Sequence, residues 1–170
     1  MSNFLTSNDF TFLSLPEIHW QTIRDEFYQV EHRAEKWPPK LLQGGEQDAT
    51  DGIENNNGKW YIVPLYYNGV KFSEDACPIT HSCIKEVPNI IQAGFSIMEP
   101  GCEIYPHVGP ADVYRSHLGL VCNNQSKIIV EGEEYTWQEG KVMAFNDLKH
   151  HHASNFSESN RVVLIMDFII

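Results

Sequence analysis

The fold of this chain is decided by the stretch Tyr105-Pro-His-Val-Gly-Pro-Ala-Asp-Val-Tyr-Arg-Ser-His-Leu-Gly-Leu120. Proline and glycine on both sides of His107 mark the end of one strand and a sharp connection. Beyond the connection, Arg115 and His117 are two residues apart and so share one face of the next strand. If that face lines a barrel, a cation and an imidazole point inward together, which is costly without an anionic partner. The pattern favours an anion-binding cavity, and the alternative is a strand face exposed to solvent.

Short segments with strand character follow one another along most of the chain. Turn-forming residues separate them, as in Glu99-Pro-Gly101 and Glu131-Gly-Glu133. The segments lie at 60–67, 92–98, 102–107, 113–121, 127–131, 134–137, 141–145 and 161–168. Several short strands at this spacing are typical of a sandwich or barrel. The sequence predicts a mainly β fold, a double-stranded β-helix (jelly roll, cupin-like) with one or two N-terminal helices packed on it.

The first part of the chain has a different character. Ser14-Leu-Pro-Glu17 has the capping-box pattern, and the apolar spacing that follows predicts an amphipathic helix over 16–33. A short second helix is expected near 77–87. The polar stretch 43–58 predicts a long loop, which is either a lid or binding loop or a disordered segment. We expect one domain over 1–170, with the helix and polar loop at about 1–58 and the jelly-roll core at about 60–168.

The composition argues against several classes of function. The 170 residues carry a formal net charge of −11, which disfavours nucleic acid and anionic membranes as partners. No apolar run is long enough to span a membrane, and the N-terminus lacks the pattern of a secretion signal. The four cysteines show no paired C-x-x-C spacing, so a cysteine-rich zinc site is not expected. We therefore expect reduced thiols and a cytoplasmic location.

Two of the eight histidines are candidate metal ligands. His107 and His151 each lie beside the end of a predicted strand, and Arg161 follows the second at a spacing of ten. In a double-stranded β-helix two such histidines can bind one metal ion, and neutral imidazole suits iron(II), zinc and copper. Arginine is well suited to hold a carboxylate through two hydrogen bonds. The neighbouring His150 and His152 leave open the alternative that this segment is only a polar loop.

Six segments resemble the aspartyl/asparaginyl β-hydroxylase domain family, over about residues 60–168. They are Phe95-Ser-Ile-Met-Glu-Pro-Gly101, Pro106-His-Val-Gly-Pro110, Arg115-Ser-His-Leu-Gly-Leu120, Trp137-Gln-Glu-Gly-Lys141, Phe145-Asn-Asp-x-x-x-His151 and Arg161-x-x-Leu-Ile-x-Asp167. The resemblance implies an iron(II)- and 2-oxoglutarate-dependent dioxygenase, which uses O2 to hydroxylate an unactivated C–H bond. The implied substrate is the β-carbon of an Asp or Asn residue, or a related amino acid, small peptide or other small molecule.

The resemblance also implies how the iron is held. His107 and His151 would be its two protein ligands, and both would be catalytic. A third, carboxylate ligand is usual two residues after the first histidine, but Gly109 stands there. In the family that this chain resembles, water takes the place of this carboxylate, so the glycine is expected.

Five further residues receive roles from the resemblance. Ser96 and Arg161 would bind the distal carboxylate of 2-oxoglutarate. Arg115 and His117 would bind its metal-proximal end, and Trp60 would shape the cosubstrate pocket.

Some positions depart from the family pattern. Asn146 replaces a usual aspartate, Ser154 stands where tryptophan is common, and the basic residues expected to contact an acidic peptide are not recognisable. Two other functions stay open. One is a 2-oxoglutarate-dependent halogenase, with chloride in the vacant ligand position. The other is a non-catalytic jelly-roll binding module, against which the intact set of site residues counts.

Overall fold

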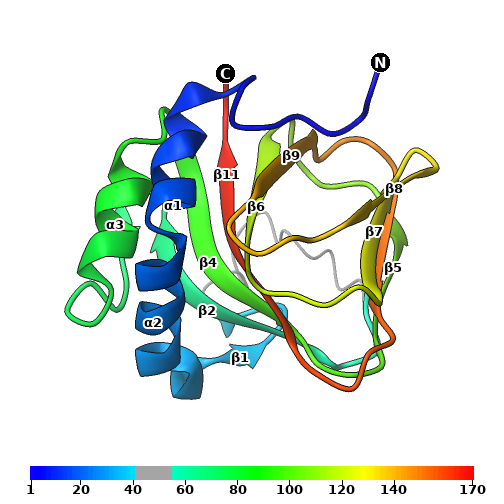
Figure 1. Cartoon of the computed structure of the whole chain (residues 1–170), viewed down its shortest axis with the longest axis horizontal. Coiled ribbons are helices and arrows are strands. Elements are labelled where there is room, and N and C mark those ends of the chain that lie inside the picture. Colours follow the sequence, from blue (N-terminus) through cyan, green and yellow to red (C-terminus); the bar gives the residue numbers. More distant parts are fainter. Residues whose placement is uncertain (41–54) are drawn as a thin grey trace.

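A computed structural model describes residues 1–40 and 55–170, so most of the predicted loop over 43–58 lies outside the described residues. Two β-sheets face each other (Figure 1). The larger sheet has the strand order β1 (Glu35–Lys36), β2 (Trp60–Tyr67), β4 (Ile90–Met98), β11 (Arg161–Phe168), β6 (Tyr114–Val121) and β9 (Val142–Asn146), with β3 (Val70–Lys71) paired to β2. The smaller sheet has the order β5 (Cys102–His107), β10 (His151–Asn155), β7 (Ser126–Val130) and β8 (Glu133–Thr136). The predicted jelly roll is confirmed.

The helices cover the outer face of the larger sheet (Figure 1). They are α1 (Ser14–Ile18), α2 (Trp20–Val30) and α3 (Pro78–Lys85), with short 3-10 turns at Thr11–Leu13 and Glu31–Arg33. The helix predicted over 16–33 is thus divided into α1 and α2, whereas the one predicted near 77–87 corresponds to α3. Helix α2 buries Ile23, Phe27 and Val30, which explains the spacing of its apolar residues. Within the described ranges, no helix has the length and apolar character needed to cross a membrane.

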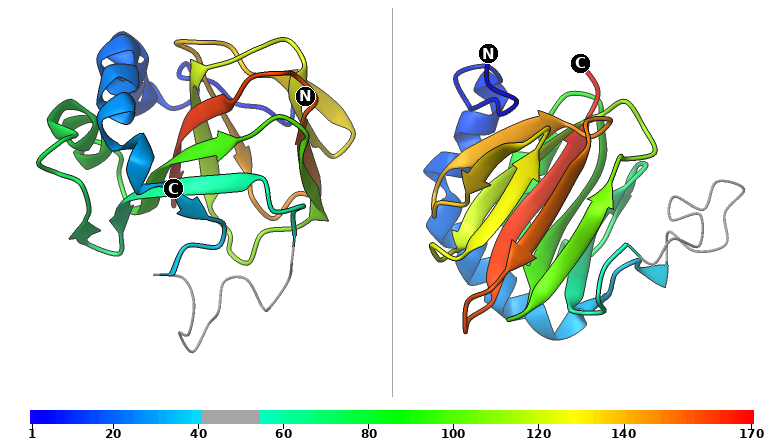
Figure 2. Two further views of the ribbon diagram at one scale, coloured as in Figure 1. Left: turned by 90° about the horizontal axis from the view of Figure 1, so that it is seen from below. Right: turned by 90° about the vertical axis from the view of Figure 1, so that its right-hand side faces the viewer.

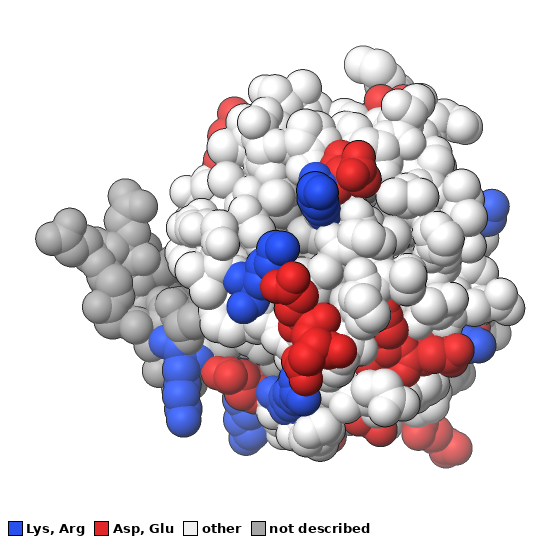
Figure 3. Space-filling view, turned by 90° about the vertical axis from the view of Figure 1, so that its left-hand side faces the viewer, with Lys and Arg blue, Asp and Glu red and all other residues white. Residues whose placement is uncertain are grey.

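The surface on the side of the helices carries mixed charge. On the face drawn in Figure 3, Lys and Arg side chains lie among Asp and Glu side chains. Two exposed ion pairs join Arg33 to Asp75 and Lys71 to Glu74. This face therefore lacks the concentrated basic patch that binds nucleic acid.

The core consists of two hydrophobic clusters. One lies between the helices and the larger sheet, and the other fills the space between the two sheets. Successive residues of β11 belong alternately to the two clusters: Val162 and Leu164 pack under the helices, whereas Val163 and Ile165 face the smaller sheet. All of β11 is buried as a result. The right-hand view of Figure 2 shows the smaller sheet from outside, with no helix of the described chain over it. The inner space between the sheets is where the predicted site residues meet.

Strand register arranges these polar residues in rows across the inner face of the larger sheet. Strand β11 lies between β4 and β6, so Asp167 pairs with Gln92 on one side and Arg115 on the other. Two residues earlier in β11, Ile165 pairs with His117. Because side chains two residues apart share a face, both rows point toward the smaller sheet. The inward direction predicted for Arg115 and His117 is correct.

Buried Glu26 connects α2 to α3. Its carboxylate accepts hydrogen bonds from the backbone N–H groups of Ile79 (2.7 Å) and Thr80 (2.9 Å). These groups belong to the first turn of α3, and the cap residue Cys77 supplies no side-chain hydrogen bond there. The carboxylate therefore takes the place of an N-cap side chain and meets the positive end of the helix dipole.

Replacing Glu26 with alanine should lower the free energy of unfolding by about 1–3 kcal/mol, because buried N–H groups lose their acceptor. Urea unfolding measures the change. Asp25 is the matched control, since it is the exposed neighbour on the same helix. Asp25→Ala should change stability by less than ~0.5 kcal/mol. Equal effects of the two substitutions would contradict the capping role.

Candidate active site

His107 and His151 face each other across two neighbouring strands. His107 ends β5 and His151 begins β10, and the antiparallel pairing of these strands sets the two residues opposite each other. Their rings lie 4.3 Å apart between centroids. Strand β10 also pairs with β7, so His151 and His152 belong to a strand, whereas His150 precedes it. Its alternation turns His151 inward, whereas His152 points to the outer face.

The two imidazoles are held in the same way. Nδ1 of His107 bonds to the backbone oxygen of Tyr105 (2.7 Å), and Nδ1 of His151 bonds to that of Lys149 (2.6 Å). A carbonyl oxygen only accepts, so each Nδ1 carries the hydrogen and each Nε2 keeps a free lone pair. Burial lowers the pKa of His107, and it lowers that of His151 to about 3. Both rings are neutral and can bind a metal through Nε2.

The carboxylate of Asp147 lies where a side chain at position 109 would extend. A Cβ placed on Gly109 would collide with Oδ2 of Asp147, and the Gly109 N–H donates to the Asp147 backbone oxygen over 2.7 Å. Oδ1 of Asp147 is 3.7 Å from Nε2 of His151 and 3.3 Å from Nη1 of Arg115. It is buried and forms no hydrogen bond within the described chain. Burial raises the pKa of this carboxyl, and Arg115 opposes the rise.

Asp147 was not among the predicted site residues. Its position four residues before His151 is visible in the sequence, but its approach to Gly109 depends on tertiary structure. Gly109 and Asp147 together are the sequence signal for this arrangement. Position 109 has no carboxylate, and the carboxylate near His151 comes from position 147 instead.

Arg161 is a buried cation without a counter-ion in the described chain. The residue is 1% exposed, its Nη2 donates to Oγ of Ser96 (3.0 Å), and its Nε has no partner among the described residues. The guanidinium lies 4.5 Å from the ring centroid of Trp137, which is a cation–π contact. Burial lowers its pKa to about 10, so it is still charged at neutral pH. A buried charge of this kind calls for an anionic ligand.

Two further donors point into the same space. Oγ of Ser96 accepts hydrogen bonds from Trp60 Nε1 (2.9 Å) and from Arg161, so its own hydrogen is left to donate. Trp137 Nε1 donates to Nδ1 of His117 (3.0 Å), which places the proton of the neutral ring on Nε2. That Nε2 is buried and has no partner in the described chain. Burial, with repulsion from Arg161, lowers the pKa of His117 well below its ordinary value.

Arg115 differs from Arg161 because its charge is compensated. Its Nε and Nη2 donate to the two carboxylate oxygens of Asp167 over 2.9 and 2.7 Å, and its Nη1 faces Asp147. Although burial lowers the pKa of Arg115, the two aspartates raise it above its ordinary value. The contact with 2-oxoglutarate expected for Arg115 stays a prediction. What the structure provides is an arginine that orients Asp147.

All seven predicted site residues line one cavity of about 370 Å³, part of it open to solvent. They are Trp60, Ser96, His107, Arg115, His117, His151 and Arg161. Apolar side chains from both sheets, such as Met98, Ile128 and Phe145, fill the remaining wall. No group of three or more His, Cys, Asp or Glu residues in the described chain is arranged to hold a metal. His107 and His151 present an Nε2 with a free lone pair, and their role as metal ligands stays a prediction.

The sequence and the fold are similar to those of known proteins. The sequence model for "Aspartyl/Asparaginyl beta-hydroxylase" matches residues 17–170. An ornithine lipid ester-linked acyl 2-hydroxylase from Rhizobium tropici is 38% identical, covering 72% of this chain and 47% of the relative. The human aspartyl/asparaginyl beta-hydroxylase is 32% identical, covering 89% of this chain and 20% of the relative. The chain thus spans less than half the length of these two relatives.

Two solved structures share the fold. A Pseudomonas putida prolyl-4-hydroxylase has a TM-score of 0.54 at 12% identity, covering 90% of this chain and 86% of its own. HygX from Streptomyces hygroscopicus, crystallised with nickel and 2-oxoglutarate, has a TM-score of 0.54 at 10% identity, covering 87% and 78%. At such low identity these likenesses concern the fold alone. By the match over residues 17–170, the chain belongs to the aspartyl/asparaginyl β-hydroxylase family, as its sequence motifs predicted.

Proposed function

We propose that this protein is an iron(II)- and 2-oxoglutarate-dependent hydroxylase. The observation that carries the proposal is Arg161, a buried cation that lacks a counter-ion in the described chain and lies in the same cavity as two inward-facing histidines. A dicarboxylic acid with one end at the arginine and the other near the histidines satisfies both features. 2-Oxoglutarate has this chemistry, and HygX was crystallised with it.

The residues present fit an iron(II) centre with two protein ligands. His107 and His151 are neutral, their Nδ1 hydrogens are committed to backbone oxygens, and their Nε2 atoms are available. Bound iron(II) would activate O2 and supply the oxidising chemistry. The backbone bonds at Nδ1 fix the orientation of both rings and keep them in the tautomer that can bind metal.

The remaining polar residues would orient the cosubstrate. Arg161 and the free hydroxyl hydrogen of Ser96 would bind its distal carboxylate. The indole N–H of Trp60 donates to Ser96 Oγ and so orients the hydroxyl. Nε2–H of His117 would donate to an oxygen of the same molecule. Each of these donors is buried, so its hydrogen bond to a carboxylate would be stronger than the same bond in water.

The free oxygen of Asp147 supports hydroxylation over halogenation. Its Oδ1 can accept a hydrogen bond from water beside the histidines, and Arg115 holds the carboxylate in position. A chloride ion next to this carboxylate would meet like charge in a buried site. The reaction we propose consumes 2-oxoglutarate, O2 and a substrate C–H bond, and yields succinate, carbon dioxide and the corresponding alcohol.

The names of the relatives cover two substrate classes, an aspartyl or asparaginyl side chain and a lipid acyl chain. Both contain an unactivated C–H bond, so the same two-histidine centre serves either one. We also propose that the substrate belongs to one of these two classes, that the reaction uses O2 and that the protein acts in the cytoplasm.

Metal binding should depend on the two inward-facing histidines. We expect His107→Ala and His151→Ala each to weaken cobalt(II) binding by at least ~100-fold, since losing an outer partner of a ligand already costs about 10–100-fold. His152→Ala is the matched control, because this side chain lies on the opposite face of β10. Equilibrium dialysis of the three variants gives the affinities. Equal weakening by all three would contradict the assignment.

The two buried arginines should have opposite effects on stability. In the absence of 2-oxoglutarate, Arg115→Met should lower the free energy of unfolding by ~3–5 kcal/mol, because two buried aspartates lose their partner. Arg161→Met should leave stability unchanged or raise it, because it removes an uncompensated charge. Adding 2-oxoglutarate should stabilise the wild type but not Arg161→Met. Urea unfolding measures all three proteins without 2-oxoglutarate, and the wild type and Arg161→Met with it. A strong loss of stability in Arg161→Met alone would refute this view.

Turnover should produce succinate. With iron(II), 2-oxoglutarate and O2, we expect succinate and hydroxylated product in equal amounts, and none from His107→Ala or His151→Ala. Mass spectrometry of the product after addition of chloride should show no chlorinated species. Undiminished succinate formation in both histidine variants would refute the proposed function. No succinate with any substrate tested, despite bound 2-oxoglutarate, would favour the non-catalytic binding module.

A further inference from the structure

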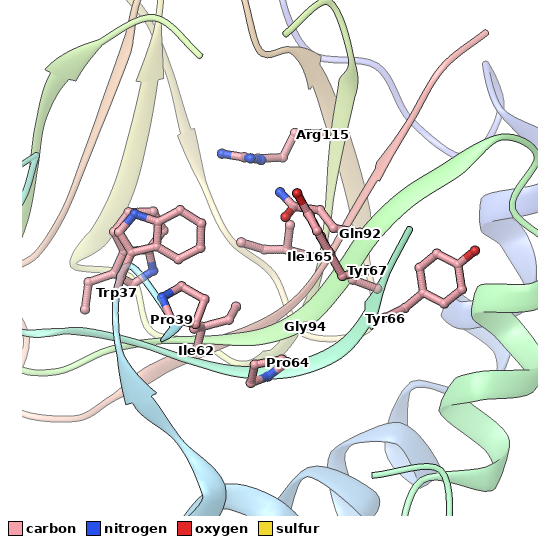
Figure 4. A pocket seen from close by; sticks show the side chains of 12 residues that line it. Trp37, Pro39, Ile62, Pro64, Tyr66, Tyr67, Gln92, Gly94, Arg115 and Ile165 are labelled. Carbon is pink, nitrogen blue, oxygen red and sulfur yellow. The ribbon is translucent and has the colours of Figure 1, made fainter. Parts of the chain in front are cut away.

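A second cavity adjoins the candidate active site on the side of β2. Its empty volume is about 420 Å³ when the adjoining open solvent is counted, and it shares Trp60, Arg115 and Ile165 with the first cavity. Figure 4 shows Arg115 at one end of this space and Pro64 at the other, with Trp37 and Ile165 between them. A ligand in the second cavity would therefore lie next to the residues that face the metal site.

The walls of the second cavity are almost entirely apolar. Trp37 stacks on Trp60 with 4.4 Å between ring centroids, and its backbone N–H donates to the Trp60 oxygen over 2.9 Å. Ile62 and Ile165 contribute aliphatic surface, and Gly94 between them has no side chain to fill the space. A Cβ on Gly94 would lie 2.9 Å from the Ile62 side chain, so this position tolerates no larger residue without movement. The apolar residues that line the cavity are Trp37, Pro39, Trp60, Ile62, Pro64, Ala93, Gly94 and Ile165.

The polar groups in this cavity are already engaged. The guanidinium of Arg115 is paired with Asp167 and Asp147, and the amide of Gln92 donates to Asp167. The ring of Tyr66 points away from the space (Figure 4), which leaves the Tyr67 hydroxyl as a neutral partner. A carboxylate entering here would meet an arginine that already faces two aspartates, so it would gain little from that charge. The cavity is therefore suited to an uncharged ligand.

The two cavities differ in the cations that line them. Arg115, whose charge is compensated by two aspartates, lines both cavities. Arg161, which has no counter-ion in the described chain and suits a carboxylate, lines the first cavity and not the second. Trp60 lies between them, with its indole nitrogen bonded to Ser96 on the cosubstrate side and its ring stacked on Trp37 on the other. The first cavity therefore suits a dicarboxylate, and the second cavity suits an apolar group.

We propose that the second cavity binds the uncharged aliphatic chain of the substrate and that this protein hydroxylates such a chain rather than an aspartate or asparagine side chain. The proposal rests on the hydroxylase function above and specifies the substrate for the same site. Apolar walls stabilise each buried methylene, and an anionic group would gain little from Arg115, whose charge Asp147 and Asp167 already compensate.

The test uses N-methylamides of straight-chain fatty acids of increasing length as probes. Capped aspartate and capped asparagine are the comparison ligands. Tryptophan fluorescence reports binding at Trp37 and Trp60, and mass spectrometry reports hydroxylation with iron(II), 2-oxoglutarate and O2. We expect affinity to rise about fourfold with each added methylene until the cavity is filled. The capped amino acids should bind at least about tenfold more weakly than the best amide, since they bury less apolar surface.

Ile62→Phe tests whether the chain occupies this cavity. Ile62 lines the second cavity and not the first, so the larger ring should shorten the chain length at which affinity stops rising. Ile129→Phe is the matched control on the outer face of the smaller sheet and should leave that length unchanged. An identical length dependence in wild type and Ile62→Phe would overturn the placement.

The outcomes separate this inference from the proposed function. Succinate formed with capped aspartate or asparagine, together with affinity that does not depend on chain length, would overturn the inference and keep the hydroxylase function. The absence of iron-dependent succinate with every probe would count against the hydroxylase function itself. Chain-length dependence with hydroxylation of the amides supports both.

Discussion

A guanidinium buried without a counter-ion is the constraint on which the site depends. Arg161 begins the central strand β11, between β4 and β6. Its guanidinium donates to a neutral hydroxyl, that of Ser96, and has no carboxylate partner in the described chain. Contact with the Trp137 ring compensates part of the charge. The desolvation cost of burying this cation would be offset in full only by an anionic ligand. A dicarboxylate with one end at Arg161 would supply that charge.

Arg115 shows the opposite solution, level with Asp167 at the other end of β11. Its charge is compensated by Asp167 and Asp147, and the pairing in turn fixes Asp147 beside the two histidines. The glycine at position 109 belongs to the same arrangement, because a side chain there would displace the aspartate. The chain thus has no carboxylate at position 109 but keeps one, that of Asp147, 3.7 Å from His151 Nε2. The uncompensated Arg161 suits a charged ligand, whereas the compensated Arg115 adjoins the apolar second cavity.

Much of the fold and site could be predicted because both follow from local patterns. Alternation placed Arg115 and His117 on one inward face, and the spacing of His151 and Arg161 indicated a strand connection. Three features could not be predicted. Strand β10 has the polar sequence His-His-Ala-Ser-Asn and forms because β5 and β7 pair with it on both sides. The approach of Asp147 to Gly109 and the stacking of Trp37 on Trp60 join residues from separate elements, and no periodicity encodes them.

The most direct test of the central claim is an anaerobic titration of the metal-free protein with iron(II) and then 2-oxoglutarate, followed by visible absorption. The claim is that two histidines hold the iron while Arg161 holds the far end of the 2-oxo acid. It predicts that a metal-to-ligand charge-transfer band appears in the wild type and is lost from Arg161→Met at the same concentrations. Failure of the band to appear in the wild type, or an equally intense band in Arg161→Met, would contradict it.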